Sequence, residues 1–442
     1  MVTSGNTFSK SVRMLAMVIL DAYVVAILSP KTVIARPVEW GWQGMIRFVS
    51  SSLGTQAPQI LFWIGYLFAA LAGVWYFFRY RTVYKRVSPV RRTIDSVGLL
   101  IGVYLLDPWV STVSNYSWTA ISWVFPISIL FFLILVLRDD KIVQHLLKVI
   151  SVAIIIECIY AIVYHLIGIH QFYTPRFGLR TRGTLGNPIY LGVLVMAGLP
   201  ILLNQAMLTK TNPQRTLWWL GVAVALLASW LTYVRSVWLG IAALFLNYAL
   251  AFRDTRTRKV SWGMISVTLL LILCILLLRP PFVPQDRSGR GRLAIWEVAL
   301  SRIVPLHPII GAGAGSYYDL QSKYLTSRLA QFNPSNAEPK NLYLLLLIEH
   351  GVVGLALFSM LVLRIIQLAY SLSKATDCTQ CQTVSLLLKG TTASLLTAGL
   401  FETPMLYQGR EASSFVFFTV IACGCVIALT NFESEKEGRG SS

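Results

Sequence analysis

Long apolar segments separated by short polar connections occupy most of this chain. Twelve of them are at least as long as the roughly 17–25 residues that a helix needs to cross about 30 Å of bilayer hydrocarbon. The pattern therefore predicts an all-α integral membrane protein with about 12 transmembrane helices in a single polytopic domain, residues 1–442. Arg13 lies inside the first span and Asp21 interrupts it, so we interpret this span as retained and not as a cleaved signal peptide. The predicted spans are 11–28, 60–78, 94–112, 118–137, 148–169, 187–208, 217–233, 236–252, 260–278, 341–370, 384–401 and 412–429.

One polar stretch departs from this pattern. Residues 279–340 form a single large loop between the ninth and tenth predicted spans, whereas the other connections are short. Binding and catalytic residues gather on loops that a rigid scaffold positions. We therefore expect this loop to contain short helices and to form part of an active site.

Composition supports a membrane protein and narrows its chemistry. Apolar residues make up 55% of the chain and charged residues 13%, which is too apolar for a water-exposed globule. The six cysteines give no disulfide framework, because only Cys378 and Cys381 lie outside the predicted spans, in a lone C-x-x-C. A zinc site needs about four ligands. We expect no metal, no cofactor and no nucleic-acid partner.

Basic residues indicate the orientation of the spans. Short loops rich in Lys and Arg stay on the cytoplasmic side, and residues 79–92 form such a loop, with six basic residues and no acidic one. If the spans alternate, both termini are cytoplasmic and the loop 279–340 faces outward.

The predicted outer side is nevertheless basic at three places. The loop 279–340 carries eight basic and four acidic residues, Arg176, Arg180 and Arg182 precede the sixth span, and Arg235 lies between two spans. An arginine so close to hydrocarbon is costly and usually functional. These groups fit an anionic ligand, although anionic lipid head groups, or simple tolerance of charge in a long loop, would also account for them.

Four sequence blocks carry a resemblance to a known family. They are Gly183–Gly192, the pair Arg235–Ser236 followed by Trp238, the run from Arg292-x-x-x-Trp296 to Gly311-x-Gly313, and Asn341 leading to Glu349-x-Gly351. Over residues 150–430 the chain resembles the bacterial O-antigen ligase and O-antigen polymerase superfamily of membrane glycosyltransferases.

The resemblance implies a reaction and a location. The enzyme would transfer a glycan from an undecaprenyl diphosphate-linked donor to an acceptor glycan on the outer face of the bacterial cytoplasmic (inner) membrane. The acceptor would be lipid A-core for a ligase or a growing polysaccharide for a polymerase, and the motifs do not separate the two. The implied mechanism is inverting and metal-independent, since preorganised arginines stabilise a diphosphate leaving group in place of a divalent ion.

The resemblance also implies site residues. Arg235 and Arg292 stand where the family's essential arginines fall, so we assign both to the diphosphate. Lys340 departs from the family, which commonly has histidine before the asparagine. Lys340 is then a base with a lowered pKa, a further phosphate ligand with Glu338 or another acid as base, or the mark of an altered site. The other expected substrate-binding residues are Arg180, Arg182, Asn187, Arg290, Asn341 and Glu402, which orients an arginine, contacts sugar or pairs with Arg410.

Two other function classes fit a basic polytopic protein. A lipid-linked oligosaccharide transporter or flippase would also bind a lipid diphosphate, but transporters often contain internal repeats, and no matching halves are visible here. A non-catalytic partner in polysaccharide export would tolerate the change at Lys340.

Overall fold

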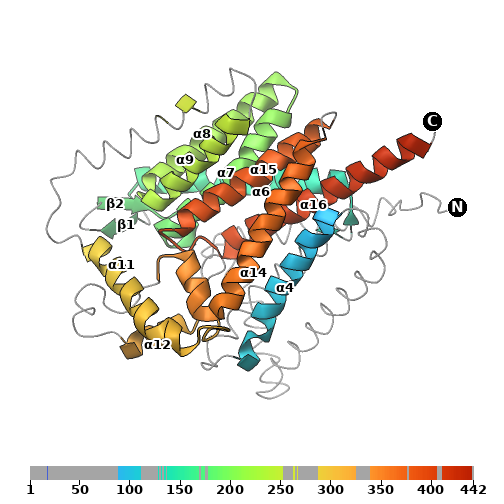
Figure 1. The fold of residues 1–442 in the computed structure, drawn as a ribbon. Coiled ribbons are helices and arrows are strands. Elements are labelled where there is room, and N and C mark those ends of the chain that lie inside the picture. The colour runs from blue at the N-terminus through green and yellow to red at the C-terminus, as the bar shows by residue number, and fades with distance from the viewer. Residues whose placement is uncertain are drawn as a thin grey trace, which may run out of the picture.

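The computed structural model describes residues 88–110, 137–168, 171–174, 178–251, 287–324, 339–375, 378–405 and 411–440, with a few isolated positions between them. Long helices lying side by side dominate this part of the chain (Figure 1). Each overlaps a predicted span, whereas the predicted spans 11–28, 60–78, 118–137 and 260–278 fall wholly or mostly outside the described residues. The long helices are α4 (Ser88–Val110), α6 (Asp140–Leu166), α7 (Pro188–Leu208), α8 (Asn212–Leu231), α9 (Arg235–Ala251), α14 (Leu342–Ser373), α15 (Thr379–Gly399) and α16 (Glu411–Gly440).

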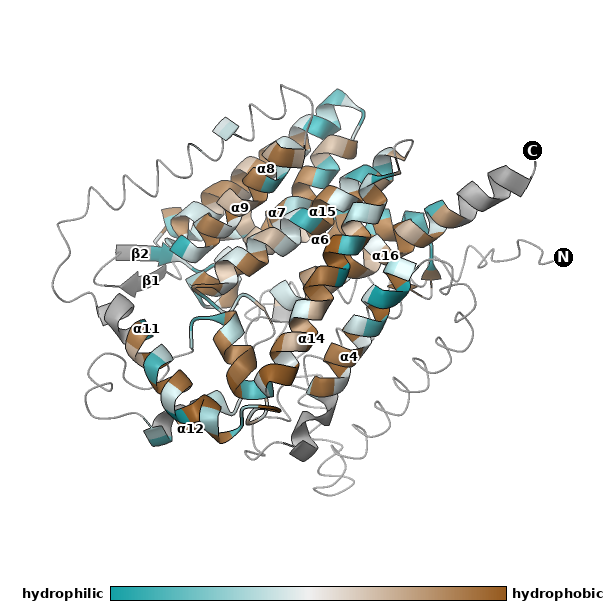
Figure 2. Cartoon of the chain, viewed as in Figure 1, coloured by the Kyte–Doolittle hydropathy of each residue, from teal (hydrophilic) through white to brown (hydrophobic). Residues whose placement is uncertain are grey.

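The chain is a helical multi-pass membrane protein. Among the described residues, α6, α7, α14 and residues 412–432 of α16 are long and apolar enough to cross a membrane, and α9 is a shorter apolar helix. Figure 2 shows apolar residues along most of the helical bundle. In the apolar windows of α7 and α16, 89% and 94% of the residues are buried, against 44% in α6 and 33% in α14. Helices α7 and α16 therefore form the centre of the bundle, whereas α6 and α14 present apolar faces outward.

A short β-hairpin departs from the predicted all-α class. Strands β1 (Gln171–Thr174) and β2 (Gly178–Thr181) pair antiparallel, with Phe172 opposite Arg180. Four-residue strands are too short to produce a clear alternation of apolar and polar positions, which explains why the pattern did not predict them. The 3₁₀ turn η1 (Gly183–Leu185) then leads to α7, and Thr184 anchors it to α6 by donating to the Glu157 carboxylate from its N–H (2.8 Å) and its hydroxyl (2.6 Å).

Helix α14 is broken in the middle, which corrects the prediction of one continuous span over 341–370. Gly351 has φ 61° and ψ −162°, and the helix consists of two parts that meet at this residue. In Figure 1, the two parts of α14 (orange) meet at a sharp angle. A residue with a side chain is strongly disfavoured in this conformation, so the glycine sets the position of the break.

A segment of the large loop fills this break with hydrogen bonds. Ala312 and Gly313 donate their N–H groups to the carbonyls of Ile348 (2.9 Å) and Glu349 (2.8 Å). In return, Val352 and Val353 donate to Pro308 (2.9 Å) and Ile309 (3.0 Å). These four groups of α14 would pair with one another in a regular helix, so the loop replaces the two bonds that the break removes. The N–H of Gly315 also donates to the Glu349 carboxylate (Oε1) at 2.9 Å, so a side chain of α14 holds the loop in addition to the backbone groups.

Short helices precede and follow the docked segment. Helix α11 (Arg287–Val298) continues into the π-helical turn η2 (Ala299–Ile303) and the 3₁₀ turn η3 (Val304–Leu306), and α12 (Tyr317–Tyr324) follows the docked residues. A small apolar cluster joins them to the first half of α14, with Ile295, Ile303, Tyr317 and Leu345 among its members. The docking and this cluster together hold α11 against the bundle.

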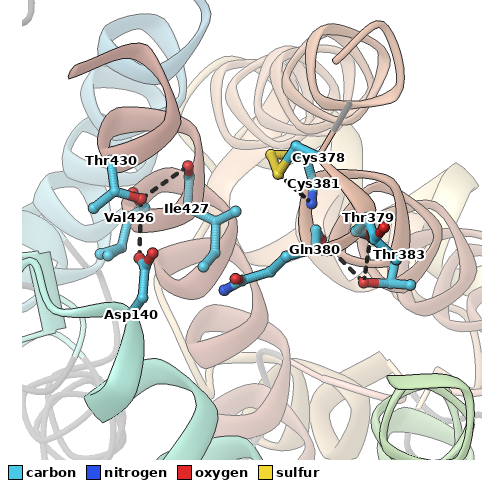
Figure 3. The surroundings of a disulfide bond; sticks show 9 residues. All are labelled: Asp140, Cys378, Thr379, Gln380, Cys381, Thr383, Val426, Ile427 and Thr430. Carbon is cyan, nitrogen blue, oxygen red and sulfur yellow. Dashed lines mark hydrogen bonds between the residues drawn. A yellow bond between two sulfur atoms is a disulfide. The ribbon is translucent and has the colours of Figure 1, made fainter. Parts of the chain in front are cut away.

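Cys378 and Cys381 form a disulfide, which the sequence analysis did not predict. Cys378 is the N-cap of α15, and its sulfur accepts a hydrogen bond from the N–H of Cys381 at 3.1 Å (Figure 3). The first turn of a helix brings residues three apart onto one side, which places the two sulfurs together. Cys158, Cys423 and Cys425 are buried free thiols in α6 and α16.

Candidate functional site

A cavity of about 530 Å³ lies where β2, the α8–α9 turn, α11 and the end of α15 meet. Its polar wall contains Arg180, Arg235, Arg292 and Glu402, four of the residues predicted for the site. The volume is in the range of small-molecule sites. The remaining wall is mostly apolar or aromatic and comprises Ile189, Tyr233, Val234, Ser236, Leu239, Leu293, Trp296 and Phe401.

Arg180 reaches this cavity from the hairpin. Its Nε donates to the carbonyl of Thr232 at 2.8 Å, and Thr232 is the residue that ends α8. A cation is favourable at a helix C-terminus, where the last carbonyls lack helical partners. Burial lowers the pKa of the Arg180 guanidinium, and the Glu402 charge opposes that shift. Arg180 therefore stays a cation and lies within electrostatic range of Glu402.

The end of α15 organises the opposite wall. Arg292 Nη1 donates to the Phe401 carbonyl and Asn341 Nδ2 donates to the Leu400 carbonyl, both at 3.1 Å. In α11, Trp296 Nε1 donates to the Pro339 carbonyl at 2.7 Å, next to Lys340. Arg292 of α11 and Asn341, which directly follows the large loop, are thus tied to the same helix terminus. This arrangement brings Arg292 and the segment around Lys340 to the same place.

Lys340 and Glu402 form an ion pair at this terminus. Their Nζ and Oε1 atoms are 3.1 Å apart, and the Glu402 side chain is 1% exposed against 21% for Lys340. A buried carboxylate needs a partner charge or hydrogen bonds to offset its desolvation. Glu402 lines the cavity, whereas Lys340 is not among the lining residues and contacts the cavity wall through Glu402.

Two residues of this region have left-handed backbone conformations. Tyr233 has φ 54° in the turn between α8 and α9, and Lys340 has φ 51° directly before the N-cap of α14. For residues with a Cβ this region costs about 1–2 kcal/mol. Such strain is retained where the surrounding structure imposes it, and it is often found at functional sites.

The comparison with known proteins identifies the segment that carries most of this site. Residues 190–359 match the O-antigen ligase family. By this match, the segment is similar to O-antigen ligases. It contains Arg235, Arg292 and Lys340. A search of curated proteins finds no match for the chain.

Two cavity residues lie outside the matched segment. Arg180 precedes it and Glu402 follows it, yet both line the cavity that Arg235 and Arg292 line. The site therefore uses a longer part of the chain than residues 190–359.

The other predicted substrate-binding residues are not among the described residues that line the cavity. Asn187 is the N-cap of α7, with Oδ1 accepting from Ile189 N–H at 2.9 Å, and Asn341 caps α14 by accepting from Leu344 N–H at 2.9 Å. Arg182 is partly buried before η1. The side chain of Arg290 and the predicted residues Arg176 and Glu338 lie outside the described part of the structure. A substrate role for this group stays a prediction.

The sequence did not predict that the carbonyls of Thr232 and Phe401 hold the arginines, because every residue has a backbone carbonyl and its role cannot be read from the residue type. Tyr233 was not singled out, although it lies two residues before Arg235. The pairing of Lys340 with Glu402 was also missed, although the lone acid at the end of a predicted span was a usable signal. Among the described residues, no group of three or more His, Cys, Asp or Glu is placed to hold a metal ion.

Proposed function

We propose that this protein is a metal-independent, inverting membrane glycosyltransferase. It transfers a glycan from an undecaprenyl diphosphate-linked donor to an acceptor glycan on the outer face of the cytoplasmic membrane, as an O-antigen ligase or a polysaccharide polymerase. The observation that carries the proposal is the gathering of Arg180, Arg235 and Arg292, from three separate elements, around one cavity in a chain whose residues 190–359 match the O-antigen ligase family.

The chemistry of the cavity supports a diphosphate leaving group. As the bond between sugar and phosphate breaks, negative charge develops on the diphosphate, and fixed cations in a water-poor site stabilise it. Arginine forks match phosphate oxygens bidentately. A guanidinium has five donors, and Arg292 uses one of them to hold a backbone carbonyl, so Arg292 keeps donors for a phosphate.

The apolar wall contributes in two ways. Ile189, Val234 and Leu239 keep the local dielectric low, which strengthens each interaction between an arginine and a phosphate oxygen. An apolar wall beside cations also suits a donor whose diphosphate is joined to a long hydrocarbon chain.

The first test is glycan transfer by the purified full-length protein in detergent, with a polyprenyl diphosphate-linked glycan as donor. We expect product by mass spectrometry, at an unchanged rate in the presence of a chelator. A rate that the chelator abolishes and magnesium or manganese restores would contradict the arginine mechanism.

Donor binding without any transfer would favour a transporter or an assembly partner. Supplying lipid A-core and a second carrier-linked glycan as alternative acceptors separates ligase from polymerase.

The second test concerns the charge of Lys340. The ion pair with the buried Glu402 carboxylate at 3.1 Å supports a role for Lys340 as a partner cation and not as a base. We expect Lys340→Arg to retain transfer within about tenfold of wild type, because arginine supplies the same charge at a position where a carboxylate accepts hydrogen bonds. Lys340→Ala should lose more, because it leaves the buried Glu402 without this partner. A Lys340→Arg protein that binds donor normally and transfers nothing would restore lysine as the base.

A further inference from the structure

The proposed reaction needs a group that removes a proton from the acceptor hydroxyl. Arginine keeps its proton at any working pH, so Arg180, Arg235 and Arg292 do not supply this function. Lys340 is held as a cation by an ion pair and does not line the cavity. Among the described lining residues, Glu402 carries the carboxylate.

We propose that Glu402 is the general base of the transfer reaction and that Lys340 positions it, an inference that rests on the proposed function. Glu402 faces the cavity from the turn after α15, beside Phe401, whose carbonyl holds Arg292. The base and the carbonyl that holds one diphosphate cation therefore belong to adjacent residues of the chain.

The bonding changes balance as follows. The acceptor hydroxyl oxygen attacks the anomeric carbon of the donor while its proton passes to the Glu402 carboxylate. The bond between the anomeric carbon and the phosphate oxygen breaks, and its electron pair stays on the diphosphate. The product has the opposite anomeric configuration, and the proton later leaves Glu402 for solvent.

Charge in the cavity is conserved through this step. Glu402 loses one negative charge as it takes the proton, and the diphosphate gains one as it leaves. The ammonium of Lys340 then loses its carboxylate partner, so protonation of Glu402 is coupled to this ion pair. The Oε1 atom of Glu402 also accepts from the N–H of Thr403 at 3.4 Å, and a carboxylate offers about four acceptor positions.

Position supports the assignment over a purely structural ion pair. An ion pair that only stabilises the fold has no need to line a cavity, and replacing a buried pair by apolar residues is often neutral or stabilising. Glu402 instead lies in the turn after α15, where the carbonyls of Leu400 and Phe401 hold Asn341 and Arg292, and its charge also acts on Arg180. The same terminus thus aligns groups from three elements.

The experiment measures single-turnover glycan transfer and donor binding for full-length Glu402→Gln, which keeps the shape and loses the basic carboxylate. We expect transfer to fall about 10²–10⁴-fold, with the donor dissociation constant within about threefold of wild type and the acid limb of the pH–rate profile lost. Glu297→Gln is the matched control, because Glu297 is an exposed acid in α11, and it should behave as wild type.

The pH profile distinguishes a base from a structural partner. Five charged or titratable groups lie around the Glu402 carboxylate. They are Arg180 from the hairpin, Tyr233 and Arg235 from the α8–α9 turn and the start of α9, Arg292 from α11, and Lys340 from the segment before α14. Tyrosine and lysine titrate in the alkaline range and arginine does not titrate, so an acid limb reports on the carboxylate.

Each outcome either supports or contradicts the assignment of Glu402 as the base. Glu402→Gln transferring within threefold of wild type, while Arg235→Lys is inactive, overturns the base and leaves the proposed function intact. Wild-type protein that binds donor and never transfers overturns the proposed function itself. If Glu402→Gln does not fold, the wild-type profile is decisive, because a saturated transfer rate that is flat from neutral to acid pH contradicts a carboxylate base.

Discussion

Arg235→Lys and Arg292→Lys should each lower glycan transfer by on the order of 10²–10³-fold, the usual effect of removing one preorganised donor from a developing negative charge. Lysine keeps the positive charge but presents a single ammonium in place of a planar fork, so bidentate contact with the diphosphate is lost. The measurement is the transfer rate of purified protein at saturating acceptor, together with the donor dissociation constant.

The control for this prediction is Arg302→Lys. Arg302 is exposed in the turn that follows α11, so it shares the loop and the charge of Arg292 but not the cavity. We expect this variant to transfer at the wild-type rate. Arg292→Lys working as well as wild type would exclude the diphosphate assignment for Arg292.

Arg292 also has a structural role, and the test must separate the two. Its Nη1 donates to the Phe401 carbonyl at 3.1 Å, which fixes α11 against the end of α15. A lysine ammonium can make one such bond, so Arg292→Lys should fold. An unchanged melting temperature combined with lost transfer assigns the effect to the diphosphate. Arg235 starts α9 and needs the same comparison.

The sequence predicted the important cations because a charged residue near hydrocarbon is rare and costly, and so carries information by itself. Arg235 was selected on that basis, Arg292 from the family resemblance and Arg180 from the cluster of three arginines before the sixth predicted span, and the structure brings them to one cavity. The described helices that overlap predicted spans were predictable because the bilayer sets the length of such helices. Neither inference required knowledge of tertiary contacts.

The rest depended on contacts between segments far apart in the chain. An apolar pattern over 341–370 contains no signal for the break at Gly351, because Ile348 to Val353 remain apolar or helix-compatible apart from the glycine. The break exists because Pro308 to Gly313 supply the missing hydrogen bonds. Lys340 looked like the loss of a family histidine, and its meaning changed only when Glu402 was found beside it.

Gly351→Ala should release the docked loop and abolish transfer. Holding an alanine at φ 61° and ψ −162° costs about 1–3 kcal/mol for the backbone conformation alone. A Cβ at this position would also overlap the backbone of Ile309 and the N–H of Gly311, so the loop must move away as well. The four hydrogen bonds across the break are then lost together.

This loss should reach the cavity, because the docked segment and the small apolar cluster hold α11, which carries Arg292. We therefore expect Gly351→Ala to insert in the membrane, to melt at a lower temperature than wild type and to transfer no detectable glycan. Gly102→Ala is the matched control, since Gly102 lies within α4 with open space around its Cβ position, and alanine favours a helix by about 0.5–1 kcal/mol. Because α14 would be free to become a regular helix in Gly351→Ala, amide hydrogen exchange should show faster exchange at Ala312 and Gly313. Wild-type transfer and exchange in that variant would mean that the break in α14 does not position the site.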